Sequence, residues 1–242
     1  MRAMILAAGR GERLRPLTDT CPKPLLPVGG RPLIEWHLQR LAAAGVHEVV
    51  VNNAHLGQQI EQALGDGTRW GLRIRHSPEG TALETAGGIA HALPLLGDEP
   101  FLVVNGDVFT DFDFGRAVTI AAQMQAGALL AWCVLVDNPA EHPEGDFSLQ
   151  DGRLRHRAGT SLTFSGIAVY RPEVFSALAP GQRQRLRPIL DALIDAGRIG
   201  AEHHGGQWVD VGTPQRLASL DAQCHARSDR NADAAARISW PR

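Results

Sequence analysis

Three short apolar runs, each of strand length and each followed by glycine or polar residues, constrain the fold of this chain most strongly. They cover residues 3–8, 49–51 and 101–104, and amphipathic patterns of helical period stand between them, for example at 31–42 and 85–93. Continuous apolar runs are typical of strands that are buried on both faces, and strands that alternate with helices form βαβ units. The sequence therefore predicts an α/β fold built on a mostly parallel sheet.

The pattern changes in the second half of the chain. Strand-like runs at 128–136 and 162–170 lie on either side of an Asp-Gly hairpin turn at 151–152. Helical patterns return at 186–196 and 214–226, and the latter is the last helix that the sequence predicts. We therefore expect an addition to the sheet that is not made of simple βαβ units.

The change of pattern suggests how the chain is organised. We expect one domain over residues 1–227, in two parts that cover 1–126 and 127–227. The remaining segment, 228–242, is rich in Ala, Arg and Asp and has no clear apolar period. Such a terminal segment is predicted to be a mobile tail.

Bulk composition limits the partners of the protein. A formal net charge of -2 gives no overall attraction to nucleic acid or to an anionic membrane, so anion binding must come from a local cluster. No apolar stretch approaches the ~18 residues of a membrane-spanning helix. Cys21, Cys133 and Cys224 are widely spaced and odd in number, as in reduced cytoplasmic proteins. We expect a cytoplasmic protein with small-molecule partners, no nucleic acid and no membrane contact.

Polar clusters follow the apolar runs at the points where the strands should end. Residues 9–13 follow the first run, Asn52 and Asn53 follow the second, and residues 105–107 follow the third. Ligands of parallel α/β sheets bind at the carboxyl ends of the strands. The three clusters are therefore predicted to converge on one crevice.

The first cluster has the composition of an anion-binding loop. Gly9 and Gly11 supply flexible backbone amides, and Arg13 and Lys23 supply charge. Lys23 is the only lysine in a chain whose Lys and Arg total 24, and a compact ammonium is not interchangeable with a guanidinium. The loop lacks the third glycine of a dinucleotide fingerprint and the Gly-Lys-Ser/Thr of a Walker A motif. It suits the triphosphate of a nucleotide.

Two aspartates are candidate metal ligands. Asp107 follows the third apolar run, and Asp210 stands in a Trp-Val-Asp-Val-Gly-Thr segment over a hundred residues later. Mg²⁺ is typically held by one or two carboxylates together with phosphates and water. No Ser-His-acid arrangement or poised cysteine is evident. If the attacking group is a sugar phosphate, no general base is needed, because such a phosphate is already mostly dianionic at pH 7.

Long ordered motifs in this chain resemble those of the sugar-phosphate nucleotidyltransferases. They are LAAGRGERLRPLT at 6–18, Pro-Lys-Pro-Leu at 22–25, Asn-Gly-Asp at 105–107 and the segment 208–213, and the resemblance extends to about residue 225. It implies a Rossmann-like mixed, mostly parallel sheet of the nucleotide-diphospho-sugar transferase type with a sugar-binding insertion. It also implies that a nucleoside triphosphate and a sugar 1-phosphate give an NDP-sugar and pyrophosphate, by in-line attack on the α-phosphorus.

The resemblance assigns roles to residues of both parts of the chain, with the nucleotide bound by 1–126 and the sugar by 127–227. Arg13 and Lys23 are the expected catalytic residues, and Asp107 and Asp210 the expected ligands of Mg²⁺. The nucleotide is expected to contact Ala8, Gly9, Gly11, Glu12, Arg13, Lys23, Thr85 and Gly87. The sugar is expected to contact Asn105, Gly145, Asp146, Ser165 and Gly166.

The choice of substrate is the least determined feature. The segments 136–147 and 163–167 are most similar to family members that transfer a uridylyl group from UTP to N-acetylmuramate α-1-phosphate in cell-wall recycling. Many hexose relatives use a Glu-Lys-Pro segment, which is absent here because Lys23 is the only lysine. A mannose-1-phosphate guanylyltransferase or a glucose-1-phosphate thymidylyltransferase is an alternative, and a non-catalytic nucleotide-sugar sensor is an alternative of another class. We expect a monomer or small homo-oligomer.

Overall fold

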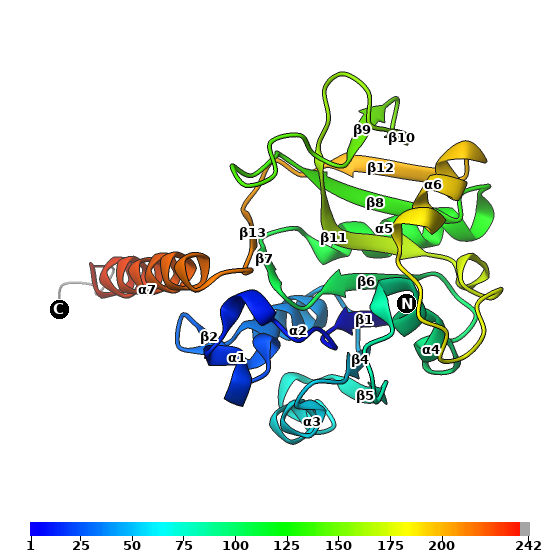
Figure 1. The fold of residues 1–242 in the computed structure, drawn as a ribbon. Coiled ribbons are helices and arrows are strands. Elements are labelled where there is room, and N and C mark those ends of the chain that lie inside the picture. The colour runs from blue at the N-terminus through cyan, green and yellow to red at the C-terminus, as the bar shows by residue number, and fades with distance from the viewer. Residues whose placement is uncertain (238–242) are drawn as a thin grey trace.

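The structure, a computed structural model, describes the backbone of residues 1–237 and the side chains of residues 1–227. The described chain forms a nine-stranded sheet in the order β5-β4-β1-β6-β11-β8-β12-β10-β9, and the short pairs β2-β3 and β7-β13 flank it (Figure 1). The strands are β1 (Ala3–Leu6), β2 (Pro27–Val28), β3 (Arg31–Pro32), β4 (Glu48–Asn53), β5 (Arg73–Pro78), β6 (Phe101–Asn105), β7 (Val108–Thr110), β8 (Ala131–Val136), β9 (Phe147–Gln150), β10 (Arg153–His156), β11 (Thr163–Tyr170), β12 (Ile199–His203) and β13 (Trp208–Asp210). The helices are α1 (Leu17–Thr20), α2 (Leu33–Ala43), α3 (Gly57–Leu64), α4 (Glu84–Leu96), α5 (Phe114–Ala126), α6 (Arg187–Asp195) and α7 (Pro214–Arg237).

The first half of the chain forms the parallel part of the sheet. Strand β1 pairs in parallel with β4 and β6, and β4 pairs in parallel with β5. In the second half, β11 runs antiparallel to both β6 and β8, β12 returns parallel to β8, and β9 and β10 add an antiparallel pair at the edge. The predicted mixed, mostly parallel α/β sheet is therefore confirmed. Leu6 lies opposite both Asn52 and Asn105, so the three central strands end together.

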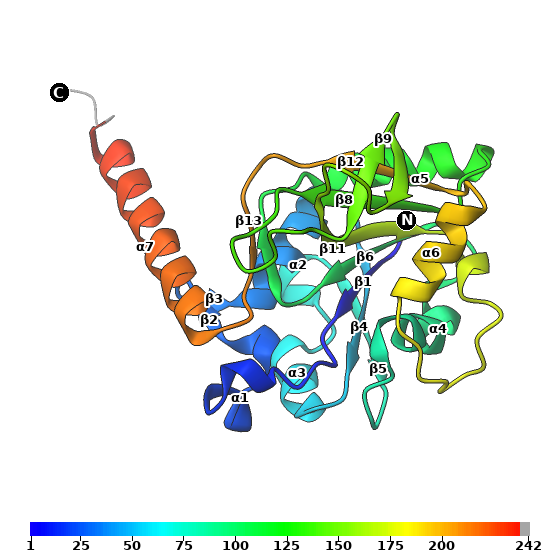
Figure 2. The same ribbon diagram turned by 45° about the horizontal axis from the view of Figure 1, so that its top comes forward.

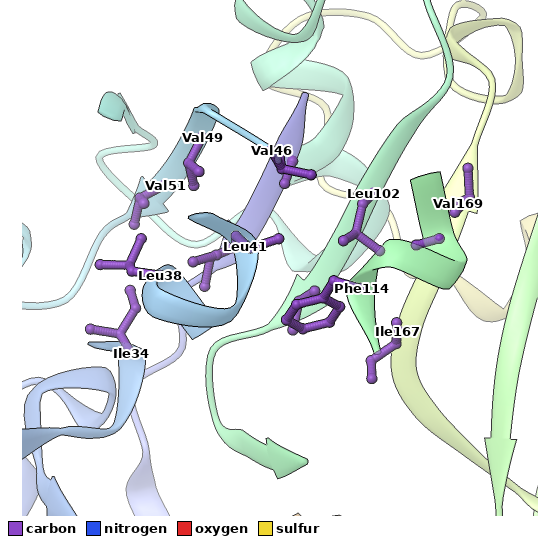
Figure 3. Packing of buried hydrophobic residues seen from close by; sticks show 14 of the residues in the cluster. Ile34, Leu38, Leu41, Val46, Val49, Val51, Leu102, Phe114, Ile167 and Val169 are labelled. Atoms are coloured by element: carbon purple, nitrogen blue, oxygen red, sulfur yellow. The ribbon is translucent and has the colours of Figure 1, made fainter. Parts of the chain in front are cut away.

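Alternating residues of the central strands face two separate hydrophobic layers. Ala3 and Ile5 of β1 pack with α2, α3 and α5, whereas Met4 packs on the other face with α4 and α6. Side chains of a strand alternate between its two faces, and here both faces are buried, so every position of the strand is apolar. Figure 3 shows Leu38 and its neighbours on α2 packed toward Val51 of β4.

Because Leu38 is fully buried in this layer, its truncation should leave a cavity under the sheet. Leu38→Ala is expected to lower the free energy of unfolding by about 2–5 kcal/mol, measured by urea denaturation. Leu17→Ala is the matched control, since Leu17 is 42% exposed, and should change that free energy by about 0.5 kcal/mol or less. Equal losses in the two variants would contradict the packing described here.

Helix α7 begins against the small sheets and then extends away from the body of the protein (Figures 1 and 2). The backbone N–H of Gly29 donates to the Asp221 carboxylate at 2.7 Å, and a Cβ on Gly29 would come within 2.7 Å of Cys224. Since the helix continues to Arg237, the prediction that it ends near residue 226 is wrong. The expected tail is therefore helical over 228–237, and its remaining part, 238–242, lies outside the described residues.

None of the helices in the described part of the chain combines the length and the apolar character that are needed to span a membrane.

Candidate functional site

A cleft of about 310 Å³ opens at the carboxyl ends of β1, β4 and β6. The polar clusters that follow these strands in the sequence all contribute to it, as predicted, because parallel strands in register end at the same edge. Segments after β5 and before α6 complete the walls. The lining residues are Leu6, Ala7, Ala8, Gly9, Lys23, Pro24, Asn52, Glu79, Ala82, Glu84, Thr85, Asn105, Asp107 and Arg183.

The glycine-containing loop after β1 is held by the neighbouring strand and by its own turn. The Ala7 N–H donates to Asn52 Oδ1 at 2.7 Å, and the Thr18 hydroxyl donates to the Gly11 carbonyl at 2.9 Å. Gly11 has φ +64°, and a Cβ there would approach the Thr18 methyl to 2.9 Å. Glycine is therefore required by both the backbone conformation and the space available. Gly9 lines the cleft. Arg13 is not among the lining residues: its side chain is 67% exposed and lies 3.8 Å from Asp210 Oδ2.

Lys23 lies between the two candidate metal ligands. It follows Pro22 in a short 3₁₀ turn and is only 7% exposed. Its Nζ donates to Asp107 Oδ2 at 2.6 Å and lies 4.0 Å from Asp210 Oδ1. A lysine is almost never buried unless its charge is paired. The only lysine of the chain is thus paired with Asp107 and lies near a second carboxylate, that of Asp210.

A two-stranded sheet brings these aspartates together although they are distant in the sequence. Strand β13 pairs with β7 so that Asp210 lies opposite Val108, and the Val211 N–H donates to the Asp107 carbonyl at 2.9 Å. The side chains of Asp107 and Asp210 are 37% and 26% exposed. Both carboxylates are therefore partly accessible, and Asp107 lines the cleft.

The donor set fits a hard divalent cation that shares its coordination with substrate. Asp107 and Asp210 each direct one carboxylate oxygen toward the Lys23 ammonium, so the two carboxylates lie close together. No group of three or more His, Cys, Asp or Glu side chains that could hold a metal occurs among the described residues. An ion such as Mg²⁺ would then have two protein carboxylates and complete its shell with phosphate and water oxygens.

The wall after β5 is built around Glu79. This carboxylate accepts from the Asn52 amide at 2.6 Å and from the Leu83 N–H at 2.8 Å, which fixes the entry into α4. Thr85 lines the cleft. Gly87 does not, because it packs under the loop before α6, where a Cβ would lie 2.3 Å from the Gln182 carbonyl. A contact of Gly87 with a nucleotide base stays a prediction.

Of the five predicted sugar contacts, Asn105 is the one that lines the cleft. Gly166 supports it from β11: with φ +78°, a Cβ there would lie 2.5 Å from the Asn105 amide nitrogen. Ser165 is buried, and its hydroxyl donates to the Val134 carbonyl at 2.7 Å and accepts from the Ile167 N–H at 3.1 Å. The Ser165 hydroxyl is thus committed to the backbone of the sheet.

Gly145 and Asp146 end the loop between β8 and β9 and join it to β11. Asp146 accepts from the Phe164 N–H at 2.9 Å and pairs with His142 at 3.0 Å. Gly145 has φ +61°, and a Cβ there would meet the Leu162 carbonyl at 2.8 Å. These contacts place the two residues in the framework of the loop, and their contact with a sugar stays a prediction.

The support that Gly166 gives to Asn105 can be tested. Gly166→Ala introduces both an unfavourable φ and an overlap with the Asn105 amide, so we expect the amide to be displaced from the cleft. The KM for the sugar phosphate should rise about tenfold or more, while the KM for the nucleotide stays within about threefold. Gly152→Ala is the control, because it has φ +69° but nothing within 4 Å of its added methyl. Equal effects in the two variants would contradict this role of Gly166.

The sequence did not predict the basic residue of the loop before α6. Arg183 lines the cleft and pairs with Glu84 at 2.7 Å. Its segment has no periodic pattern, and it reaches the cleft only because Gln184 exchanges backbone hydrogen bonds with Leu83 and Ala86. The sequence does indicate Asn52, because this residue directly follows an apolar run, but it predicts only that the side-chain amide lies in the crevice.

The cysteines do not supply a nucleophile to the cleft. Burial raises the pKa of the Cys133 thiol far above its usual range, and it also raises the pKa of Cys21 and Cys224. Because the thiolate is the reactive form, none of the three is activated.

Comparison with known proteins gives one consistent result. The family model described as "Nucleotidyl transferase" matches residues 2–227. An N-acetylmuramate alpha-1-phosphate uridylyltransferase of Neisseria meningitidis is 54% identical over 226 residues, covering 92% of this chain and 97% of that protein. One of the same name from Caulobacter vibrioides is 37% identical, covering 91% and 96%. A solved Bacillus anthracis structure, described as a glucose-1-phosphate thymidylyltransferase, superposes with a TM-score of 0.82 at 22% identity, covering 93% and 95% of the two chains.

Proposed function

This chain belongs to the nucleotidyl transferase family, and we propose that it transfers a uridylyl group from UTP to N-acetylmuramate α-1-phosphate, giving UDP-N-acetylmuramate and pyrophosphate. The observation that carries the proposal is the position of Lys23 in the cleft, between Asp107 and Asp210. A buried ammonium beside two accessible carboxylates suits a reaction in which a highly charged phosphate chain is bound and divided.

The nucleotide is bound by the loop after β1. Its triphosphate lies along the amides of residues 9–13, with the Arg13 guanidinium at its outer side, and its base faces the wall that contains Thr85. Lys23 turns its ammonium from Asp107 toward the α-phosphate when that phosphate arrives. At about 4 Å and an effective dielectric near 20, the attraction energy between one such cation and one phosphate charge is about 4 kcal/mol, before the cost of desolvating the two groups is subtracted.

The transfer step needs no protein nucleophile. A phosphate oxygen of the sugar 1-phosphate forms a bond to the α-phosphorus of UTP, and the bond from that phosphorus to the β-phosphate oxygen breaks, releasing pyrophosphate. Asn105 orients the sugar phosphate for in-line attack. Asp107 and Asp210 would hold Mg²⁺, which when bound would neutralise charge on the phosphates.

Two observations support uridylyl and muramate substrates over the alternatives. The relatives named as N-acetylmuramate uridylyltransferases match nearly their whole length, at 54% and 37% identity. Of the two segments that resemble that group, 163–167 contains Gly166 beside Asn105, and 136–147 contacts this strand through Asp146 and Phe164. We propose on the same grounds a place in cell-wall recycling and a cytoplasmic location, the latter consistent with three cysteines that form no disulfide.

A matrix of substrates tests the proposal. Pyrophosphate release is measured with UTP, GTP and dTTP against the 1-phosphates of N-acetylmuramate, glucose and mannose, with Mg²⁺ present. We expect UTP with N-acetylmuramate α-1-phosphate to have the highest kcat/KM, by about tenfold or more. Turnover confined to GTP with mannose 1-phosphate or dTTP with glucose 1-phosphate would replace this substrate assignment, and binding without turnover of any pair would indicate a sensor.

A further inference from the structure

Three cations surround the Asp210 carboxylate, each from a different segment. Lys23 faces Oδ1 at 4.0 Å, while Arg13 lies 3.8 Å and Arg216 3.1 Å from Oδ2. Arg216 is the one of the three that makes a hydrogen bond to Asp210 among those of the described residues. Gly212 leaves room for this arrangement, since a Cβ there would lie 2.6 Å from the Arg216 guanidinium.

The position of Arg216 is unfavourable for the helix that carries it. It is in the first turn of α7, where the helix dipole favours negative charge. Its backbone is fixed there by the Thr213 hydroxyl, which accepts from the Arg216 N–H at 3.3 Å. The side chain is only 22% exposed, which a guanidinium tolerates when its charge is paired. The contacts of the side chain, and not helix stability, account for an arginine at this position.

Arg216 also reaches the loop between β8 and β9. The same Nη1 that contacts Asp210 donates to the Glu141 carboxylate. This loop, residues 137–146, contains Gly145 and Asp146 from the proposed sugar-binding part. Arg216 therefore connects the metal-ligand candidate on β13 to the loop on the sugar side.

We propose that Arg216 is a positioning residue that orients Asp210 for the metal and, through Glu141, holds the loop 137–146 at the sugar-phosphate side of the site. The inference rests on the proposed function, because it assumes that Asp210 binds Mg²⁺. By occupying Oδ2, the guanidinium leaves Oδ1 directed to the Lys23 side, where Asp107 also lies. One side chain thereby couples the geometry of the metal site to that of the loop.

Three variants separate the two contacts. Arg216→Gln removes both, and Glu141→Gln weakens the loop contact alone. Arg157→Gln is the matched control, since Arg157 pairs with Glu144 on the same loop and is half exposed. Three quantities are measured in each: hydrogen exchange of 137–146 without ligands, the Mg²⁺ concentration for half-maximal UTP binding, and KM with kcat for N-acetylmuramate α-1-phosphate.

We expect Arg216→Gln to raise the Mg²⁺ requirement and the KM for the sugar phosphate about tenfold each, the size of a lost charged hydrogen bond, and to speed exchange in the loop. Glu141→Gln should speed exchange and raise that KM while the Mg²⁺ requirement stays within twofold. Arg157→Gln should change neither the Mg²⁺ requirement nor the KM by more than twofold.

Equal behaviour of Arg216→Gln and Arg157→Gln, or a fall in melting temperature without a change in the Mg²⁺ requirement, would overturn the proposal. If Arg216→Gln does not fold, Glu141→Gln still tests the loop contact, and a KM within twofold of the parent protein would contradict it. If the parent protein turns over no sugar phosphate, the proposed function fails, while loop exchange and Mg²⁺-dependent UTP binding still decide the role of Arg216.

Discussion

Lys23→Ala is expected to lower turnover by about 10³-fold while the protein keeps its fold. The substitution removes the buried ammonium at the cleft, and the loss of one charged or donor group aimed at a reacting phosphate or oxyanion costs about 10²–10³-fold in comparable sites. It also leaves Asp107 and Asp210 without the cation between them, which further disfavours a bound polyphosphate. Stability should change little, because both carboxylates are partly exposed and remain hydrated.

The measurement is the rate of pyrophosphate release in a single turnover with saturating substrates, together with the melting temperature. Arg15→Ala is the control: Arg15 belongs to the same basic segment but pairs with the exposed Asp19 at 2.8 Å, and turnover should stay within about threefold. Lys23→Arg should recover only part of the activity, since a planar guanidinium is not interchangeable with the compact ammonium that lies between Asp107 and Asp210. Undiminished turnover of Lys23→Ala would remove this residue from the mechanism.

Asp107→Asn is expected to lower turnover by about 10²-fold or more and to raise the Mg²⁺ concentration needed for activity. The amide keeps the shape of the side chain but supplies a neutral oxygen in place of a carboxylate, which is a much weaker ligand for a hard cation. The substitution also weakens the 2.6 Å ion pair with Lys23, yet that pair is partly solvated at Asp107, so the fold should persist.

Turnover is followed over a range of Mg²⁺ concentrations, and the melting temperature is recorded in parallel. Asp111→Asn is the matched control. Asp107 directly precedes strand β7 and Asp111 directly follows it, but Asp111 pairs with His204 at 2.9 Å and not with Lys23. It should leave the Mg²⁺ dependence unchanged. A collapse of the melting temperature of Asp107→Asn with an unchanged Mg²⁺ dependence would instead make this carboxylate structural.

The central strands and their polar ends could be predicted because their signals are local. Residues 3–8 and 101–104 are apolar at every position, and Gly9 and Asn105, which follow these runs, mark the edge of the sheet. Burial on both faces and a common carboxyl end follow from this pattern alone. The convergence of Gly9, Asn52 and Asn105 on one cleft was therefore predictable from the sequence.

The pairing of distant segments could not be predicted in the same way. Asp107 and Asp210 meet through a pairing of three-residue strands, which leaves almost no periodic signal in either segment. The length of α7 was also missed, because nothing in 228–237 shows an apolar face. The family resemblance pointed to Gly87 and Ser165, but close packing places Gly87 under a loop, and the Ser165 hydroxyl is hydrogen-bonded within the sheet.

The most direct test of the phosphate and metal site proposed for Lys23, Asp107 and Asp210 is a crystal structure of the protein with Mg²⁺ and the UDP-sugar product. We expect the diphosphate to lie in the cleft, within hydrogen-bond distance of the Lys23 ammonium, and the metal to be bound by Asp107 and Asp210. The sugar should lie beside Asn105. A product whose diphosphate binds elsewhere, or a metal that contacts neither aspartate, would contradict the proposed site.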